Sequence, residues 1–93
     1  MKIIQSRSFK WKVKKFSKQE KKVLDKQVIE IAKTPYIGTE KKGDLRGVFI
    51  HKFKLKSIEY LLSYRFIRND FELIIIGPHE NYYRDLKNYL KTR

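Results

Sequence analysis

Hydrophobic side chains near the start of the chain recur at helical intervals. Phe9, Val13 and Phe16 have this spacing and predict a short helix with one buried stripe. Ser6 or Ser8 precedes the stripe and is a candidate N-terminal cap, because a serine hydroxyl accepts a hydrogen bond from an amide of the first helical turn. The pattern therefore predicts a helix that packs by a single face.

The same period continues in a longer stretch, for which we expect a helix from about residue 18 to 33. Ser17 and Glu20 have the spacing of a capping box, in which the serine accepts the Glu20 amide and the carboxylate reaches back to the serine amide. Pro35 ends this helix, since proline cannot continue its hydrogen-bonding pattern. Its apolar stripe is expected to consist of Val23, Leu24, Val28, Ile31 and Ala32.

From Leu45 onwards the pattern changes to the two-residue period of β-strands. Lys56-Ser57 and Arg68-Asn69-Asp70 are short polar connections, so the strands are expected to form an antiparallel meander. Leu73-Ile74-Ile75-Ile76 is apolar on both faces and is therefore expected in the middle of the sheet. The three predicted strands are Val48 to Leu55, Tyr60 to Ile67 and Phe71 to Gly77.

Three further segments complete the predicted architecture. Lys2 to Gln5 is typical of a short strand at a sheet edge, and Gly38 and Gly43 mark a loop before the meander. A C-terminal helix is expected after the last strand, with an apolar stripe formed by Tyr82, Tyr83, Leu86, Tyr89 and Leu90. Residues 1–93 are therefore expected to form a single α+β domain, with two N-terminal helices packed on one face of a twisted antiparallel sheet.

Charge adds the first indication of a partner. The 93 residues include 23 Lys and Arg against 10 Asp and Glu, which gives a net charge of +13. Such an excess favours a polyanionic partner, most simply nucleic acid, with an affinity that falls as salt rises. A solvated lysine surface and a complex with an acidic protein are the alternatives. The two predicted helices carry a cationic outer face, usable for nucleic acid or simply solvated, that comprises Lys10, Lys12, Lys14, Lys15, Lys18, Lys21 and Lys22.

Other compositional features narrow the class of protein. The chain has no cysteine, so it can form neither a disulfide framework nor a thiolate site. No apolar run approaches the roughly 20 residues of a membrane span, and the N-terminus lacks a signal-peptide core. A cytoplasmic protein with no membrane partner is the resulting expectation.

The order of these segments resembles the RelE/ParE superfamily of bacterial type II toxins, over essentially the whole chain. The resemblance implies the RelE-like fold and a toxin held inactive by a cognate antitoxin, whose acidic segment covers the basic groove between the long helix and the sheet. In the RelE branch the activity is cleavage of mRNA in the ribosomal A site, and in the ParE branch it is gyrase poisoning. The segments that carry the resemblance are Phe9 to Phe16, Gly43-Asp44-Leu45-Arg46-Gly47, Lys52-Phe53-Lys54-Leu55, Tyr60 to Arg65 and Gly77-Pro78-His79-Glu80-Asn81-Tyr82-Tyr83.

RelE-type cleavage, as the resemblance implies it, needs neither a metal nor a cofactor. The ribose 2′-hydroxyl attacks the adjacent phosphate, so the site must hold the phosphate, balance its charge and move protons. Lys52 and Lys54 fall on the paired strand lysines of the RelE branch and suit phosphate neutralisation or base duty. His79 follows the last strand, where some relatives place a histidine, and an imidazole titrates near neutral pH.

One expected catalytic residue is replaced in this chain. Leu61 stands where a RelE strand carries an arginine, and Arg65, on the same face by parity, is the candidate substitute. A cross-strand partnership of Arg65 with Glu72 or Glu59 is the alternative. For Lys52 and Lys54 the alternative is a pair of exposed lysines that protect the sheet from association.

The remaining candidates concern RNA contacts. Tyr82 or Tyr83 could stack on a base, although both belong to the apolar stripe of the last helix. Arg46 and Arg84 are further candidates for RNA binding. His79 has helix capping as its structural alternative, and His51 is expected to be a half-buried structural histidine. Two histidines without a supporting carboxylate pair give no metal site.

Three functions are compatible with these features. The first is an mRNA-cleaving toxin of the RelE kind acting on ribosome-bound mRNA, and the second is a gyrase-poisoning toxin without chemistry of its own. The third is a small basic RNA-binding module, which explains the charge but not the histidine loop. Lys52, Lys54 and His79 favour the first, because a protein that only binds gyrase has no need to hold them together.

Overall fold

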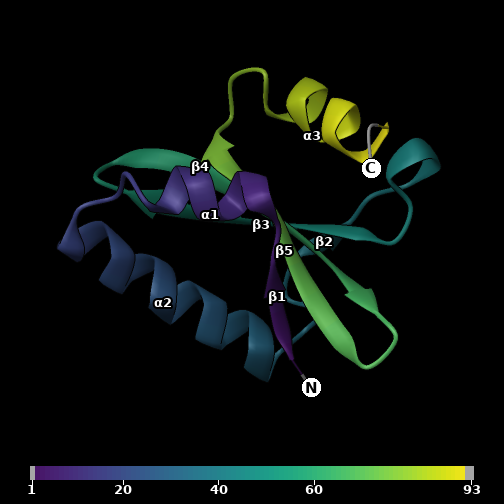
Figure 1. Cartoon of the computed structure of the whole chain (residues 1–93), viewed down its shortest axis with the longest axis horizontal. Coiled ribbons are helices and arrows are strands. Elements are labelled where there is room, and N and C mark those ends of the chain that lie inside the picture. Colours follow the sequence, from purple (N-terminus) through teal and green to yellow (C-terminus); the bar gives the residue numbers. More distant parts are fainter. Residues whose placement is uncertain (1, 92–93) are drawn as a thin grey trace.

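A mixed five-stranded sheet with helices on both faces forms the protein (Figure 1). The computed structural model describes residues 2–91. In chain order, the elements of this part are β1 (Ile3–Gln5), α1 (Arg7–Val13), α2 (Lys18–Lys33), β2 (Thr39–Glu40), a 3₁₀-helix (Gly43–Leu45), β3 (Val48–Leu55), β4 (Ile58–Ile67), β5 (Asp70–Pro78) and α3 (Tyr82–Lys91). The strand order across the sheet is β1-β5-β4-β3-β2. No helix in residues 2–91 is long and apolar enough to span a membrane.

The meander of β3, β4 and β5 is confirmed. Strand β3 has the predicted bounds, β4 begins earlier than predicted at Ile58, and β5 extends by one residue at each end. Lys56 and Ser57 form the β3–β4 turn with φ values of 52° and 67°, as a two-residue hairpin turn requires. Strand β5 lies between β1 and β4, and its side chains pack into a core on each face of the sheet, which explains why its central residues are apolar on both faces.

The two edges of the sheet differ from the expectation. Strand β1 lies at one edge, as predicted, but it pairs in parallel with β5, with Ile3 opposite Phe71. The sheet is therefore mixed and not wholly antiparallel. The opposite edge is the two-residue strand β2, which lies in the segment predicted to be a loop and pairs with β3. A 3₁₀-helix, also unpredicted, follows it.

Serine caps begin both N-terminal helices. Oγ of Ser6 accepts the amide of Phe9 at 2.9 Å, which selects Ser6 over Ser8 as the cap of α1. The Ser17–Glu20 capping box is also confirmed, with bonds of 2.7 and 3.1 Å, and α2 has the predicted bounds. These caps satisfy backbone amides that the helices themselves leave unpaired.

Two details of the helical prediction are wrong. Helix α1 ends at Val13, so Phe16 lies beyond it, although its ring still packs against the core. Val23 is 37% exposed and does not belong to the buried stripe of α2. The buried stripe is formed by Leu24 and Ile31, which are 3% and 1% exposed. Val23 lies on the side of the helix that faces solvent.

The sheet has a hydrophobic core on each face. Helices α1 and α2 cover one face, as predicted, and α3 covers the other; Figure 1 shows α3 in yellow on the opposite side of the sheet from α2. The buried residues of the α1–α2 core are Phe9, Leu24, Ile31, Phe49, Phe53, Leu55, Leu62, Tyr64, Phe71, Leu73 and Ile76. The buried residues of the α3 core are Leu45, Val48, Ile50, Leu61, Ile74, Ile75, Tyr82 and Leu86.

A β-bulge assigns the consecutive isoleucines of β5 to these cores. The register changes between Ser63, opposite Ile75, and Tyr64, opposite Leu73, so that Ile74 is the extra residue. Ile74 and Ile75 consequently both contribute to the α3 core. Helix α3 thus packs on a locally widened apolar surface.

The connection between α2 and β2 is fastened to the sheet by a buried tyrosine. The Tyr64 hydroxyl donates to the carbonyl of Pro35 at 2.8 Å and accepts the amide of Gly38 at 3.1 Å. A Cβ at Gly38 would lie 2.8 Å from that hydroxyl and 2.9 Å from the carbonyl oxygen of Ile50, so the fit requires glycine. This close approach holds β2 and the following basic loop beside β3.

Candidate functional site

Two exposed lysines extend from β3 on the face that α3 covers elsewhere. Lys52 and Lys54 alternate with Phe53 and Leu55, which belong to the α1–α2 core. The alternation places both lysines on the other face, as predicted, and neither is buried. Lys54 lies opposite Glu59 in the β3–β4 register, whereas Lys52 lies opposite Leu61. Their charges are therefore available at this surface.

The strand register brings the histidine loop to the same end of the sheet. Leu61 lies opposite Lys52 on one side and Gly77 on the other. Neighbouring strands are about 4.8 Å apart, so the backbones at Lys52 and Gly77 are separated by about 10 Å. His79 comes two residues after Gly77 and is exposed. The sheet therefore gathers Lys52, Lys54 and the His79 loop at one end.

The rings of His79 and Tyr83 lie in contact beside this end. Their centroids are 5.9 Å apart and the ring planes are nearly perpendicular. Nζ of Lys41 lies 5.0 Å from the centroid of the Tyr83 ring. Tyr83 is only partly buried, so an imidazole, a phenol and an ammonium group meet at one surface.

Lys41 was not among the candidates predicted from the sequence. It follows β2, and its amide donates to the carbonyl of Val48 at 2.9 Å, which fixes the backbone next to β3. Because Thr39–Glu40 is too short to produce a strand pattern, nothing in the sequence indicated that Lys41 lies near Tyr83. Its proximity to Tyr83 depends on that unpredicted strand.

A basic groove of about 300 Å³ continues from Tyr83 along α3. Asp44 contributes an acidic group to its wall, and the lysines give it a positive balance. Between α2 and the sheet, where the antitoxin segment was expected, lies a smaller hollow of about 110 Å³ next to Glu20 and Lys56. The larger basic groove thus borders α3, not the long helix. It is lined by Lys41, Lys42, Asp44, Leu45, Tyr83 and Lys87.

Arg65 is not part of this group of side chains. It shares the face of Lys52, as parity predicts, but it lies opposite Val48 and is therefore displaced along the sheet by four residues, about 13 Å. Nε of Arg65 lies 2.9 Å from Oε1 of Glu72, whose side chain is 4% exposed. The predicted catalytic role is thus not supported by its position, and the alternative partnership with Glu72 is the one observed.

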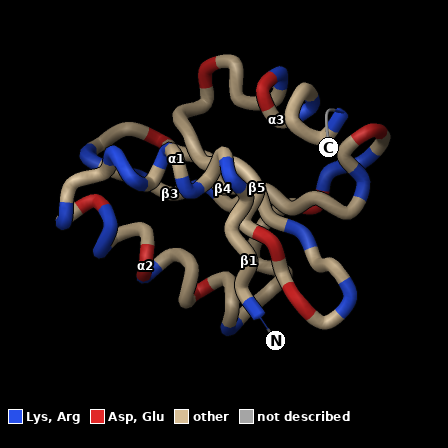
Figure 2. Tube along the Cα trace, viewed as in Figure 1, with Lys and Arg blue, Asp and Glu red and all other residues tan. Residues whose placement is uncertain are grey.

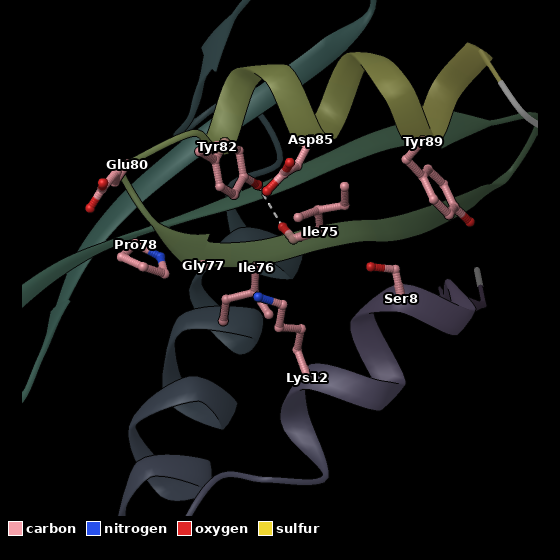
Figure 3. A pocket seen from close by; sticks show the side chains of 10 residues that line it. All are labelled: Ser8, Lys12, Ile75, Ile76, Gly77, Pro78, Glu80, Tyr82, Asp85 and Tyr89. Carbon is pink, nitrogen blue, oxygen red and sulfur yellow. Dashed lines mark hydrogen bonds between the residues drawn. The ribbon is translucent and has the colours of Figure 1, made fainter.

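Tyr82 has a structural role and cannot stack on a base. Its side chain is 2% exposed, and its hydroxyl lies 2.6 Å from the carbonyl oxygen of Ile75 and 2.8 Å from Oγ of Ser63, either of which can accept its one proton. Figure 3 shows the Tyr82 ring against β5, among the side chains that line a hollow between α1, β5 and α3. The volume of this hollow is about 260 Å³. The helix turns Tyr82 towards the core and the adjacent Tyr83 towards the basic surface. Of the two predicted stacking candidates, Tyr83 alone remains.

Leu61, which stands at the position of the RelE-branch arginine, is buried in this structure. Leu61 is 0% exposed and belongs to the α3 core, so it presents no polar group to the surface. Arg46 and Arg84 are both exposed. Nε of Arg84 lies 3.8 Å from Oδ1 of Asp85, an exposed pair that leaves its guanidinium largely in solvent. Both arginines remain accessible candidates for RNA contact.

His51 has the predicted structural environment. It is half-buried on the α2 side of β3, and its Nε2 lies 2.7 Å from Oε1 of Gln27. Burial lowers the pKa of His51 below its usual value, and the nearby Glu30 carboxylate opposes this shift. Among residues 2–91, no three His, Asp or Glu side chains lie close enough together to hold a metal ion.

Comparison with solved structures identifies the fold. The isolated E. coli RelE toxin aligns with a TM-score of 0.64 over 94% of this chain and 96% of that chain, with 22% sequence identity. A chain of the intact E. coli RelBE toxin–antitoxin complex aligns with a TM-score of 0.67 over 85% of this chain and 96% of that chain, also with 22% identity. The protein is thus a small α+β domain with the RelE fold, and the predicted fold class is confirmed.

The family follows from the sequence match. The model of the ParE-like toxins of type II bacterial toxin–antitoxin systems matches residues 3–87, and the chain belongs to this family. The predicted membership in the RelE/ParE superfamily is confirmed. No curated protein sequence gives a significant match. Membership in a two-component toxin–antitoxin family supports a cognate antitoxin as the protein's partner.

Proposed function

We propose that this toxin is an endoribonuclease that cleaves mRNA on the ribosome without a metal ion. The ribose 2′-oxygen forms a bond to the adjacent phosphorus while the bond from phosphorus to the 5′-oxygen breaks. The products are a 2′,3′-cyclic phosphate and a 5′-hydroxyl end. This reaction needs positive charge at the phosphate, one proton acceptor and one proton donor.

One observation carries the proposal: Lys52 and Lys54 are exposed on one sheet face, at the end where His79 and Tyr83 lie in contact. The two ammonium groups hold and neutralise the phosphate. His79 moves a proton, either from the attacking 2′-hydroxyl or to the leaving 5′-oxygen. Tyr83 supplies a ring for a base, and Lys41 adds charge beside it.

Gyrase poisoning is the second candidate, and two observations favour it. The family model is described as ParE-like, and the position of the RelE-branch arginine is filled by the buried Leu61. A toxin of this kind would use its basic surface only to bind. The RelE fold of the similar structures is compatible with both functions, because their 22% identity supports the fold alone.

Mapping RNA ends after induction of the toxin separates the two functions. Endonuclease activity predicts new mRNA 5′-hydroxyl ends within coding regions, together with rapid arrest of translation and intact gyrase function. Purified toxin should cleave mRNA on intact ribosomes at a rate that does not depend on added transition-metal ions. Gyrase poisoning predicts the opposite pattern, with trapped gyrase–DNA cleavage complexes and unchanged mRNA ends. The latter result would refute the endonuclease proposal.

The antitoxin is expected to cover the basic groove along α3, which Tyr83 and Lys41 help to line. A chain of the E. coli toxin–antitoxin complex shares this fold, and the groove along α3 has the positive charge to hold an acidic segment. Such a segment would exclude RNA from Tyr83 and Lys41 by occupying their surface. Co-expression with the adjacent operon gene tests the partnership: a stable complex that no longer binds RNA is expected, and recovery of free, active toxin would contradict it.

A further inference from the structure

Helix α1 and the turn after it present an exposed basic surface that the candidate catalytic site does not use. Trp11 lies four residues after Arg7 and three and four residues before Lys14 and Lys15, so all three basic residues are at helical spacing from the tryptophan. All four are exposed, whereas Phe9 on the opposite side of the helix is 2% exposed and packs into the core. We call these four residues the α1 surface.

Trp11 is the most unusual member of the α1 surface. Its side chain is 60% exposed, and Nζ of Lys15 lies 3.7 Å from its ring centroid. This cation–π contact covers part of one ring face and holds the indole near a positive charge. The remaining indole surface faces solvent. A large aromatic ring left in water beside cations is a typical feature of a binding surface.

All charged side chains near Trp11 in the sequence are positive. The chain contains no Asp or Glu before Glu20, so no carboxylate of α1 neutralises this surface. Figure 2 shows the blue Lys and Arg positions along α1 and into the start of α2. Such a surface raises the local concentration of polyanions and favours their binding. The basic residues from the start of the chain to the first residue of α2 are Lys2, Arg7, Lys10, Lys12, Lys14, Lys15 and Lys18.

The composition of the α1 surface distinguishes among polyanionic partners. A membrane-bound helix buries several apolar side chains in the lipid, but the other apolar residues of α1, Phe9 and Val13, pack against the protein core. An acidic peptide would pair with the cations and leave the indole without a matching group. Unpaired RNA provides both components, because phosphates alternate with bases that can stack on an aromatic ring.

We infer that the α1 surface is a second RNA-binding site, which takes an unpaired RNA segment by stacking one base on Trp11. Arg7, Lys14 and Lys15 hold the flanking phosphates. The surface lies on the α1–α2 side of the sheet, whereas Lys52, Lys54 and Tyr83 lie on the α3 side. It therefore binds an RNA segment different from the one at the candidate catalytic site. The inference does not depend on cleavage and applies equally to a toxin without nuclease activity.

Trp11 is the single tryptophan of the chain, so its fluorescence reports directly on this surface. The probe is a short 2′-O-methyl oligouridine, which cannot undergo attack by a 2′-hydroxyl. Stacking of a base should quench the Trp11 emission in a saturable manner, with an affinity that falls as salt rises. Polyglutamate should leave the emission almost unchanged, because it offers carboxylates but no ring. Vesicles of phosphatidylserine and phosphatidylcholine test for a membrane partner by a blue shift of the emission.

Variants test the two components of the site separately, with anisotropy of a labelled oligouridine as the readout. Trp11→Ala should weaken binding by about 5- to 100-fold, since one base–aromatic stack is worth roughly that much. Trp11→Phe should retain part of the affinity. Combined Lys14→Gln and Lys15→Gln should reduce the slope of log affinity against log salt by about 0.7 for each lysine. Combined Lys26→Gln and Lys33→Gln, two exposed lysines of α2, is the matched charge control.

Two results would overturn the inference. The first is oligouridine binding, seen by anisotropy, without a change in Trp11 emission and with equal affinity for Trp11→Ala and the wild type. The second is a response of Trp11 to polyglutamate or to the vesicles that matches or exceeds its response to oligouridine. Because Trp11 is exposed, its replacement should leave the fold and the urea unfolding midpoint almost unchanged, and circular dichroism verifies that lost binding does not reflect lost folding.

Discussion

The hydroxyl group of Tyr82, on α3, lies 2.8 Å from Oγ of Ser63, on β4, inside the core between the helix and the sheet. Oγ of Ser63 also accepts the amide of Ile75 at 3.1 Å, at the bulge where the β4–β5 register shifts. The side chain of Tyr82 thus links α3 to the one irregular point of the β4–β5 pairing. Burial raises the pKa of the Tyr82 phenol, so it stays protonated and able to donate at neutral pH.

Removal of this hydroxyl should loosen α3. Tyr82→Phe keeps the ring in the core but removes the hydroxyl that hydrogen-bonds with the Ser63–Ile75 network, so we expect the free energy of unfolding to fall by about 1–2 kcal/mol. Urea unfolding monitored by circular dichroism measures the change. Tyr83→Phe, which alters the neighbouring and partly exposed ring, is the matched control and should change stability less. Equal effects of the two substitutions would show that the buried network does not hold the helix.

The sequence predicted most of the fold because its periods are clear. Alternation in Val48–Leu55 and helical spacing in Lys18–Lys33 each fixed an element with its observed bounds. The bulge and β2 could not be predicted. Leu73–Ile76 is apolar throughout, so no alternation marks Ile74 as the extra residue, and Thr39–Glu40 is too short to have a period.

The candidate site could be predicted in part, because the two-residue period of a strand shows which face a side chain is on. Parity correctly gave the face of Lys52 and of Arg65, but parity does not determine how far apart two residues lie along neighbouring strands. That separation depends on the register of the hairpin, which placed Arg65 beside Glu72 instead. Helical periodicity likewise identified an apolar stripe in α3 without showing whether Tyr82 or Tyr83 faces the core.

The Arg65–Glu72 pair should contribute to stability rather than to catalysis. The Glu72 side chain is buried and the Arg65 side chain is 27% exposed, so the cost of Arg65→Ala lies between that of an exposed and a fully buried pair, at about 2 kcal/mol. Urea unfolding of Arg65→Ala, Glu72→Gln and the double variant gives the coupling energy. If Arg65→Ala were as stable as the wild type but inactive in cleavage, the arginine would belong to the reaction.

His51 should make stability depend on pH near neutrality. Its pKa is below the ordinary value of about 6.5 in the folded protein, so between these two values the unfolded chain binds more protons than the folded chain. The contribution of the neutral His51 ring to the free energy of unfolding is complete above about pH 6.5, and it is lost as the pH falls towards the lower pKa of the folded protein. Urea unfolding between about pH 7.5 and 5.5 should show a smaller decrease for His51→Gln than for the wild type. If the free energy of unfolding fell equally with pH in both proteins, His51 would not be the source of the pH dependence.

Lys52 and Lys54 should affect both RNA affinity and cleavage. Each ammonium group is expected to contact the scissile phosphate in the ground state and in the transition state, so Lys52→Ala or Lys54→Ala should lower the cleavage rate by about 10²-fold and also weaken RNA binding. Lys56→Ala, which removes an exposed charge from the adjacent turn, is the matched control. Equal toxicity of all three variants and the wild type would remove the lysine pair from the function and favour gyrase poisoning.

His79 should affect cleavage far more than binding. A general acid or base contributes about 10²–10⁴-fold to a rate, whereas one imidazole ring adds little to the attraction that a surface with many lysines already has for a polyanion. We therefore expect His79→Ala to lower the rate of 5′-hydroxyl formation on ribosome-bound mRNA by at least about 10²-fold, with nearly unchanged RNA affinity by anisotropy. Its exposed position predicts a change in unfolding free energy within about 0.5 kcal/mol, so lost activity would not reflect lost fold. Tyr83→Phe keeps the ring that contacts His79 and should retain most of the activity. A His79→Ala toxin that cuts mRNA at the wild-type rate would exclude the histidine from proton transfer and leave that role to one of the lysines.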